Sequence, residues 1–143
     1  MTKDDLFGEE GDAMRILVGY DGSTSAKEAL KLARKHALAF KSSVDIVTSM
    51  EKGTEQEQQA IEDAERGLEW AKTMFTDKGL DCRTHLLIRG LAPGEDILEF
   101  AKESNVDEII VGVKRRSKVG KLLMGSTAQY VILQAPCPVV TVK

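Results

Sequence analysis

The sequence lacks several features that mark membrane and secreted proteins. It has no apolar run near the roughly 20 residues that span a bilayer, and residues 1–13 lack the basic and apolar stretches of a secretory signal. Only two of its 143 residues are cysteines, Cys82 and Cys137, which is too few for a disulfide scaffold. We therefore expect a cytoplasmic protein with reduced thiols and no membrane partner.

The chain also has few signatures of catalysis. It contains neither the Walker sequence GxxxxGK[ST] nor the HxGH and SGGxDS motifs of nucleotide-transferring α/β enzymes. Its two histidines, His36 and His85, fall inside an expected helix and an expected strand, so we expect both to be structural. The sequence thus predicts no catalytic residue and no metal site, and it favours a binding module over an enzyme.

Short apolar strands alternate with helical patterns after an acidic start. Residues 1–13 have no sustained apolar period and predict a flexible N-terminal tail. Residues 14–143 predict one α/β domain, with helices beginning near Ser25, after residue 59, after residue 94 and at Ser126. The expected strands are 15–19, 44–50, 82–88, 108–112 and 138–142. This alternation indicates a parallel sheet with helices on both faces.

The segment 112–127, GVKRRSKVGKLLMGST, indicates a loop that binds an anion. Five of the eight residues 114–121 are Lys or Arg, within a chain whose net charge is −3. Because an acidic protein repels nucleic acid, this basic cluster favours a small anion over a duplex. Gly112 permits close backbone approach, and Gly125, Ser126 and Thr127 open a helix whose N–H groups favour phosphate. The structural alternative is that Ser126 only caps this helix.

Asp21 allows two interpretations. It stands beside Gly22 and before the first helix, where an aspartate forms a turn or caps the helix. It also follows the first strand, and an acid at that carboxyl end can accept from a ribose hydroxyl or hold Mg²⁺ near phosphates. The residues alone leave both interpretations open.

Three blocks of the sequence resemble the universal stress protein family: RILVGYDGSTSAKEAL, VDEIIVGVKRRS and GKLLMGSTAQYVILQAPCPVVTVK. Their order and the span from Arg15 to Lys143 make the resemblance specific. It implies a Rossmann-like, five-stranded parallel sheet of order 3-2-1-4-5. It also implies a role in stress response or signalling, and a homodimer formed through the C-terminal strand.

ATP-binding members of that family carry the motif G-x2-G-x9-G-[ST]. Here the motif begins at Gly112 and ends at Gly125 and Ser126, and Arg115 replaces its second glycine. An arginine there either blocks the phosphate pocket or pairs with a phosphate through its guanidinium. The intact spacing leads us to favour binding. The alternative is a dimeric interaction module that binds no nucleotide.

The resemblance implies ATP, or another adenine nucleotide, as the ligand, with hydrolysis slow or absent, and it leaves open whether Mg²⁺ accompanies it. The adenine is expected at the end of the second strand, the phosphates at the last helix, and the ribose near the first motif glycine. The residues expected to bind the nucleotide are Asp21, Ser49, Gly112, Arg115, Gly125, Ser126 and Thr127.

Overall fold

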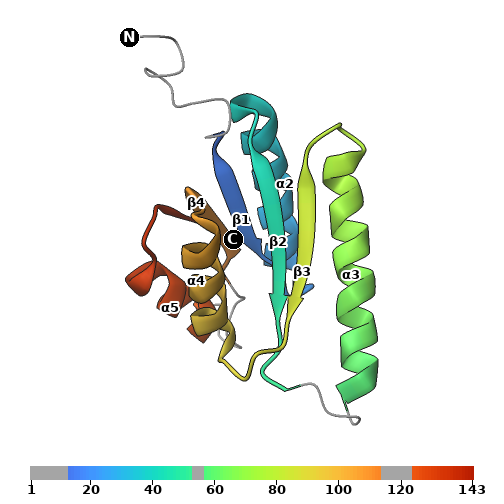
Figure 1. Cartoon of the computed structure of the whole chain (residues 1–143), viewed down its shortest axis with the longest axis vertical. Coiled ribbons are helices and arrows are strands. Elements are labelled where there is room, and N and C mark those ends of the chain that lie inside the picture. Colours follow the sequence, from blue (N-terminus) through green and yellow to red (C-terminus); the bar gives the residue numbers. More distant parts are fainter. Residues whose placement is uncertain (1–12, 53–56, 114–123) are drawn as a thin grey trace.

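The computed structural model describes residues 13–52, 57–113 and 124–143, and its five strands form one parallel sheet. The sheet order β3-β2-β1-β4-β5 confirms the expected topology (Figure 1). Four helices, α2, α3, α4 and α5, connect the strands. The elements are β1 (Arg15–Gly19), α2 (Thr24–Phe40), β2 (Ser43–Ser49), α3 (Gln58–Thr76), β3 (Cys82–Leu87), α4 (Pro93–Ser104), β4 (Glu108–Gly112), α5 (Ser126–Gln134) and β5 (Val139–Val142).

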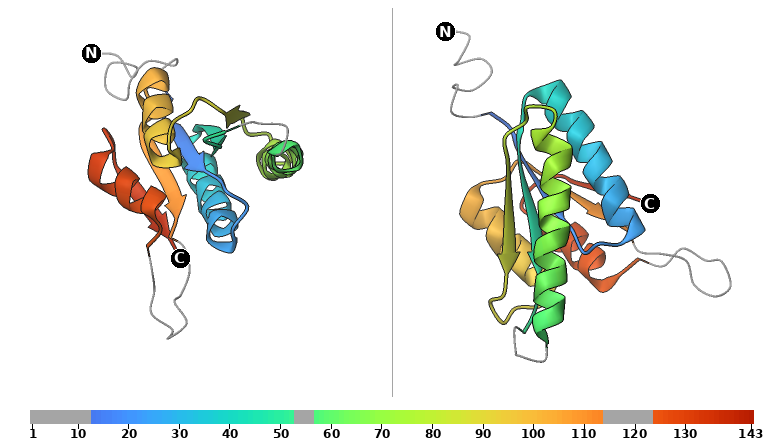
Figure 2. Two further views of the ribbon diagram at one scale, coloured as in Figure 1. Left: turned by 90° about the horizontal axis from the view of Figure 1, so that it is seen from below. Right: turned by 90° about the vertical axis from the view of Figure 1, so that its right-hand side faces the viewer.

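The sheet separates two apolar cores, because side chains alternate between its faces along each strand. Helices α2 and α3 cover one face, where Ile16 and Val18 of β1 pack. Helices α4 and α5 cover the other face, where Leu17 packs. Figure 2 shows the helices on either side of the sheet. Burial on both faces explains why β1 reads as a continuous apolar run.

The ends of the helices follow local chemistry. Ser23 caps α2, because its hydroxyl accepts a hydrogen bond from the backbone N–H of Ala26 at 3.1 Å. Two helices end at residues with left-handed backbone, Lys41 after α2 and Asn105 after α4. The expected strand 138–142 begins one residue later, at Val139, because proline has no N–H to donate to a neighbouring strand.

The order of the strands places a crevice beside β1. This strand pairs with β2 on one side and with β4 on the other. The chain continues from β1 to β2 and from β4 to β5, so it moves in opposite directions across the sheet from these two neighbouring strands. Ligands of open parallel sheets bind at such a switch point, beyond the carboxyl ends of the strands. The carboxyl ends of β1 and β4 therefore flank one site. Among the described residues, no helix is long and apolar enough to cross a membrane.

Candidate functional site

A small cavity lies where the carboxyl ends of β1 and β4 meet the first turns of two helices. Its volume is about 50 Å³, close to the size of one phosphate group. The two strands contribute its floor, and α2 and α5 contribute their N-terminal ends. The residues that line it are Gly19, Asp21, Ala26, Ile97, Val111, Gly112, Gly125, Thr127 and Ala128. We refer to this space as the small cavity.

Gly112 allows β4 to lie directly against the start of α2. A Cβ atom on residue 112 would stand 2.6 Å from the carbonyl carbon of Ser25 and 2.7 Å from the backbone nitrogen of Ala26. Both neighbours are backbone atoms, which cannot swing aside as a flexible side chain can. The glycine expected to permit close approach therefore does so, and the approach brings the first turn of α2 to the small cavity.

Helix α5 begins at the small cavity without a capping side chain. Its N-cap is Gly125, in extended backbone conformation, and Ser126 is the first residue within the helix. The alternative in which Ser126 caps the helix is therefore wrong. Thr127 and Gly125 line the cavity, whereas Ser126 does not. Because the first N–H groups of a helix and its dipole favour an anion, this end of α5 suits a phosphate oxygen.

Asp21 belongs to the turn between β1 and α2. Its carboxylate accepts a hydrogen bond from the backbone N–H of Ser23 at 2.9 Å, which makes it a turn former. Because Ser23 itself caps α2, the alternative in which Asp21 is the cap is wrong. Asp21 is exposed and lines both the small cavity and a second, larger one. The turn therefore places a carboxylate at the junction of the two cavities.

The second cavity, of about 440 Å³, lies between the end of β2 and helix α3. We refer to it as the large cavity. Its lining residues are Tyr20, Asp21, Gly22, Thr48, Ser49, Met50, Ala60, Asp63, Ala64 and Gly67. Ser49, at the end of β2, lines this cavity together with Asp21.

Sequence reasoning missed the contribution of α3 to the large cavity. Ala60, Ala64 and Gly67 recur at helical spacing and leave room beside Tyr20. A Cβ on Gly67 would lie 3.5 Å from the ring of Tyr20. The one available signal was a glycine inside a helical pattern, since such a residue lowers helix stability and often has a packing reason.

Tyr20 forms part of the wall of the large cavity and is 6% exposed. Its ring lies 6.5 Å from the ring of Trp70, and Nζ of Lys27 lies 5.7 Å from the same indole. Burial, with a smaller effect of the charge on Asp21, raises the pKa of the Tyr20 phenol. The phenol is therefore neutral at physiological pH. Trp70 is 47% exposed and packs beside Tyr20.

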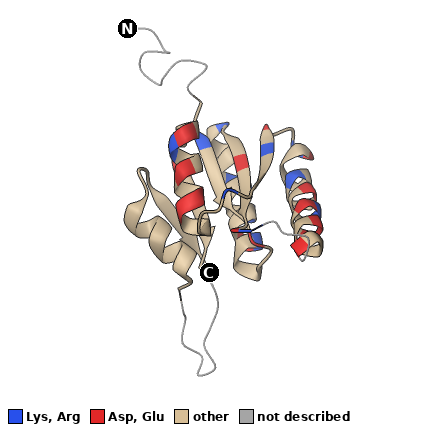
Figure 3. Ribbon diagram, turned by 60° about the horizontal axis from the view of Figure 1, so that its bottom comes forward, with Lys and Arg blue, Asp and Glu red and all other residues tan. Residues whose placement is uncertain are grey.

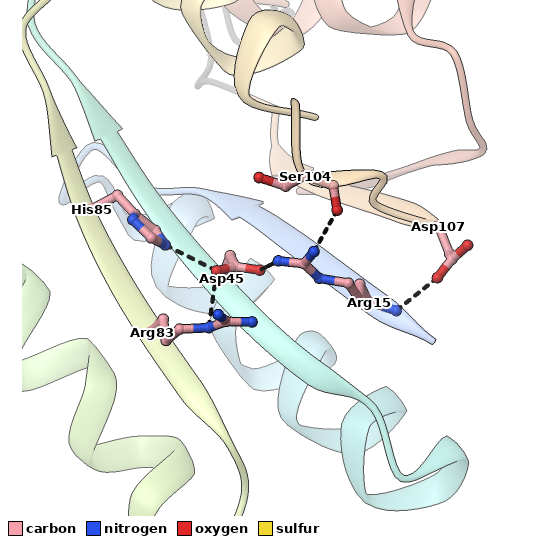
Figure 4. A network of polar contacts seen from close by, with 6 residues as sticks. All are labelled: Arg15, Asp45, Arg83, His85, Ser104 and Asp107. Carbon is pink, nitrogen blue, oxygen red and sulfur yellow. Dashed lines mark hydrogen bonds and ion pairs between the residues drawn. The ribbon is translucent and has the colours of Figure 1, made fainter. Parts of the chain in front are cut away.

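A polar cluster centred on Asp45 of β2 (Figure 4) contributes no residue to either cavity. The carboxylate of Asp45 is 1% exposed; it lies 3.0 Å from Nη2 of Arg15 and 2.9 Å from Nε2 of His85. Arg83 approaches the same carboxylate at 3.7 Å. These contacts join β1, β2 and β3. His36 likewise binds Glu108 at 2.7 Å, so both histidines contact carboxylates and line neither cavity, as expected.

Some sequence predictions lie outside the described residues. The structure does not describe residues 114–123, which include Arg115 and the rest of the basic segment 114–121. It also does not describe residues 1–12 of the acidic segment. Among the described residues there is no group of three or more His, Cys, Asp or Glu side chains that could hold a metal ion.

The sequence and structure match known proteins over most of the chain. The family model described as "Universal stress protein family" matches residues 13–143. A universal stress protein of Thermus aquaticus is 33% identical over 134 residues, which cover 90% of this chain and 97% of that protein. A universal stress protein structure from Archaeoglobus fulgidus is 36% identical, has a TM-score of 0.83, and is matched over 91% of this chain and 98% of that one.

A further solved structure contains a nucleotide. It is described as the universal stress protein from Archaeoglobus fulgidus in complex with dAMP. It is 32% identical to this chain and has a TM-score of 0.76, and the match covers 91% of this chain and 98% of that chain.

Proposed function

The chain belongs to the universal stress protein family, and we propose that it binds an adenine nucleotide at the carboxyl edge of its sheet. We assign one phosphate of the nucleotide to the small cavity, and the base and ribose to the large cavity. In this proposal the protein is a cytoplasmic module of stress response or signalling whose bound nucleotide turns over slowly or not at all. ATP is the first candidate ligand, with AMP and ADP as alternatives.

The observation that carries the proposal is the arrangement of the two cavities around Asp21. The small cavity has room for about one phosphate group and receives the N-terminal ends of α2 and α5, which favour negative charge. The large cavity has room for a base with its sugar. Asp21, which lines both, stands where a ribose between base and phosphate would present its hydroxyls. A relative that is 32% identical was solved with dAMP.

The proposed roles of the remaining residues follow from their positions. Gly125 and Thr127 meet the phosphates at the start of α5, with Ser126 in the same turn, and Gly112 lies beneath them. Arg115 belongs to the segment that joins β4 to this helix, and we propose that its guanidinium pairs with a phosphate. A Mg²⁺ ion bound with ATP would take its ligands from the phosphate oxygens and the carboxylate of Asp21.

The absorbance of the purified protein tests this proposal directly. A nucleotide retained from the expressing cells raises the ratio of absorbance at 260 nm to that at 280 nm, and mass spectrometry of the heat-released ligand identifies it. We expect an adenine nucleotide, either retained or bound again when added to stripped protein. If stripped protein at tens of micromolar binds none of AMP, ADP and ATP, with or without Mg²⁺, the proposal is wrong.

We also propose that the protein forms a homodimer through β5. This strand is at the end of the sheet order, so one of its edges has no partner strand in the described chain. The neighbouring helix α5 contains no Lys, Arg, Asp or Glu and is drawn wholly in tan in Figure 3. Its Leu133 is 77% exposed, and Tyr130 is 42% exposed. An unpaired edge beside an uncharged helix suits a second copy of the chain.

Light scattering tests the dimer. We expect twice the chain mass of 15.7 kDa for the wild type and the single mass for Leu133→Lys. The control is Leu38→Lys, which changes a leucine of α2 that is 49% exposed, and this variant should remain dimeric. A wild type of single mass at high micromolar concentration would contradict the proposal.

A further inference from the structure

We infer that the free edge of β3 is a docking site for an extended segment of a partner protein in which Lys or Arg alternates with uncharged residues. The segment adds a strand to the sheet and places its basic side chains against α3. This edge is at the opposite end of the sheet order from β5, and the inference does not depend on the proposed nucleotide site.

The outer edge of β3 presents backbone groups that no described residue pairs. The strand stands at one end of the sheet order and pairs with β2 alone among the described strands (Figure 1). The backbone carbonyls of Asp81 and Leu87 accept hydrogen bonds at 2.9 Å from β2 and from the residue that follows it. Because successive residues turn their backbone groups to alternate sides of a strand, Thr84 and Leu86 point theirs outward. An added strand would pair with these groups.

A groove of about 470 Å³ lies between β3 and α3. Thr84 and Leu86 line it, so the groove lies beside the residues whose backbone groups are free. Helix α3 contributes the other wall, which consists of Glu62, Glu65, Arg66, Leu68 and Glu69. The groove therefore has room for the side chains that an added strand would point toward α3.

The helix wall of this groove carries negative charge. We refer to Glu62, Glu65 and Glu69 as the acidic flank of α3. All three are exposed, and none forms an ion pair with another described residue. Arg66 lies among them, but its guanidinium is bound to the carboxylate of Asp63. The acidic flank thus has no cation bound to it within the described chain, and Lys or Arg side chains of a partner complement it.

The opposite face of β3 requires uncharged partner residues. Arg83 and His85 lie on that face and point toward Asp45 of β2 (Figure 4). The side chain of Arg83 is 57% exposed, so a cation beside it would be repelled. Because successive residues of a strand point to opposite faces, the partner should carry Lys or Arg only at every second position.

The same charge disfavours a second copy of this chain at β3. Two copies paired edge to edge through β3 would bring their acidic flanks together, and like charges in such a position repel. The acidic flank therefore selects against self-pairing and in favour of a basic partner.

The probe for this site is a peptide of six residues, the length of β3, in which lysine alternates with valine and both ends are capped. It is titrated into the isotope-labelled full chain at low salt, and NMR follows binding and amide hydrogen exchange. We expect saturable binding. At about ten times Kd, exchange of the Thr84 and Leu86 amides should slow by roughly tenfold, because an added strand pairs with them.

Two control peptides separate strand addition from simple attraction between charges. A peptide of three lysines followed by three valines has the same composition but cannot place all its lysines on one face. It should bind roughly threefold or more weakly. The alternating peptide methylated at its backbone nitrogens keeps its charges but has no N–H donors, so it should leave the exchange of Thr84 and Leu86 unchanged.

Paired variants test the acidic flank. Glu65→Gln combined with Glu69→Gln removes two carboxylates and should weaken binding of the alternating peptide by roughly two- to tenfold. The matched control is Glu95→Gln combined with Glu99→Gln, which removes two exposed carboxylates at the same spacing from α4. This control should bind the peptide as the wild type does.

Four results would overturn the inference. The alternating peptide fails to bind at millimolar concentration, or it binds without slowing exchange at Thr84 and Leu86. Either control peptide has the full effect of the alternating one. The paired variant of α4 loses as much affinity as that of α3. Exchange that slows only with the alternating peptide, together with weaker binding only in the α3 variant, supports docking at β3.

Discussion

At the scale of single residues, the site depends on two glycines, Gly112 and Gly125, which have no side chain. Gly112 carries no Cβ, and only for that reason can β4 end against the backbone of Ser25 and Ala26. Gly125 begins α5 without a side chain over the small cavity. In both places a phosphate would contact backbone N–H groups and no side chain.

The substitution Gly112→Ala tests this residue-scale account. The added Cβ would lie 2.6 Å from backbone atoms, so β4 and α2 must separate. We expect a loss of about 1–3 kcal/mol in the free energy of unfolding, measured by urea denaturation, together with weaker nucleotide binding. Gly19→Ala is the control, because its Cβ would meet the flexible end of Ile97 at 3.1 Å. An effect of Gly112→Ala no larger than that of the control would contradict the account.

At the scale of elements, α3 completes the large cavity at a cost to its own stability. Its Gly67 sits in the middle of a 19-residue helix, where glycine is unfavourable, and leaves space beside Tyr20. Gly67 therefore lowers the stability of α3 and leaves space for the large cavity.

We expect Gly67→Ala to increase the free energy of unfolding by about 0.5–1 kcal/mol, because its Cβ would make an ordinary contact of 3.5 Å with Tyr20. The matched control is Gly79→Ala, after the same helix, where φ is +72° and nothing lies within 4 Å. That variant should lose about 1 kcal/mol from backbone strain alone. Thermal unfolding followed by circular dichroism measures both, and destabilisation by Gly67→Ala would contradict this account of the helix.

The elements also show what the sequence could and could not predict. Apolar runs and helical periods act locally, so β1, β4 and α5 were predicted with their observed bounds, and the other strands within one residue at either end. The position of Ser49 followed from family resemblance. The contacts of Asp96 with Ser49 and of Tyr20 with Gly67 join residues 47 positions apart in each case. Such contacts depend on tertiary packing, which produces no local pattern in the sequence.

At the scale of the whole molecule, two cores share one sheet; Cys82 is buried in one of them, and Cys137, which is partly buried, packs against the other. Burial raises the pKa of Cys82 to about 12, and it also raises the pKa of Cys137. The folded protein therefore keeps these thiols neutral at a pH where the unfolded chain ionises them.

This difference predicts a loss of stability in alkali. Well below pH 9 the Cys82 thiol is neutral in both states and contributes no pH dependence. Between pH 9 and about 12 the unfolded chain releases the proton and the folded protein does not, so the free energy of unfolding should fall as pH rises. Urea denaturation at pH 7 and pH 10 measures the fall, and Cys82→Ala should reduce it. An equal fall in that variant would assign the effect to other groups.

The most direct test of the central claim is a calorimetric titration of nucleotide-stripped protein with ATP, AMP and ADP, each with and without Mg²⁺. We predict saturable binding of one adenine nucleotide per chain in the wild type. We also predict loss of that binding in Gly125→Val, whose side chain would enter the small cavity while its extended backbone, with φ at −67°, accommodates valine. A wild type without binding heat at tens of micromolar protein, or a folded Gly125→Val that binds as tightly as the wild type, would contradict the account.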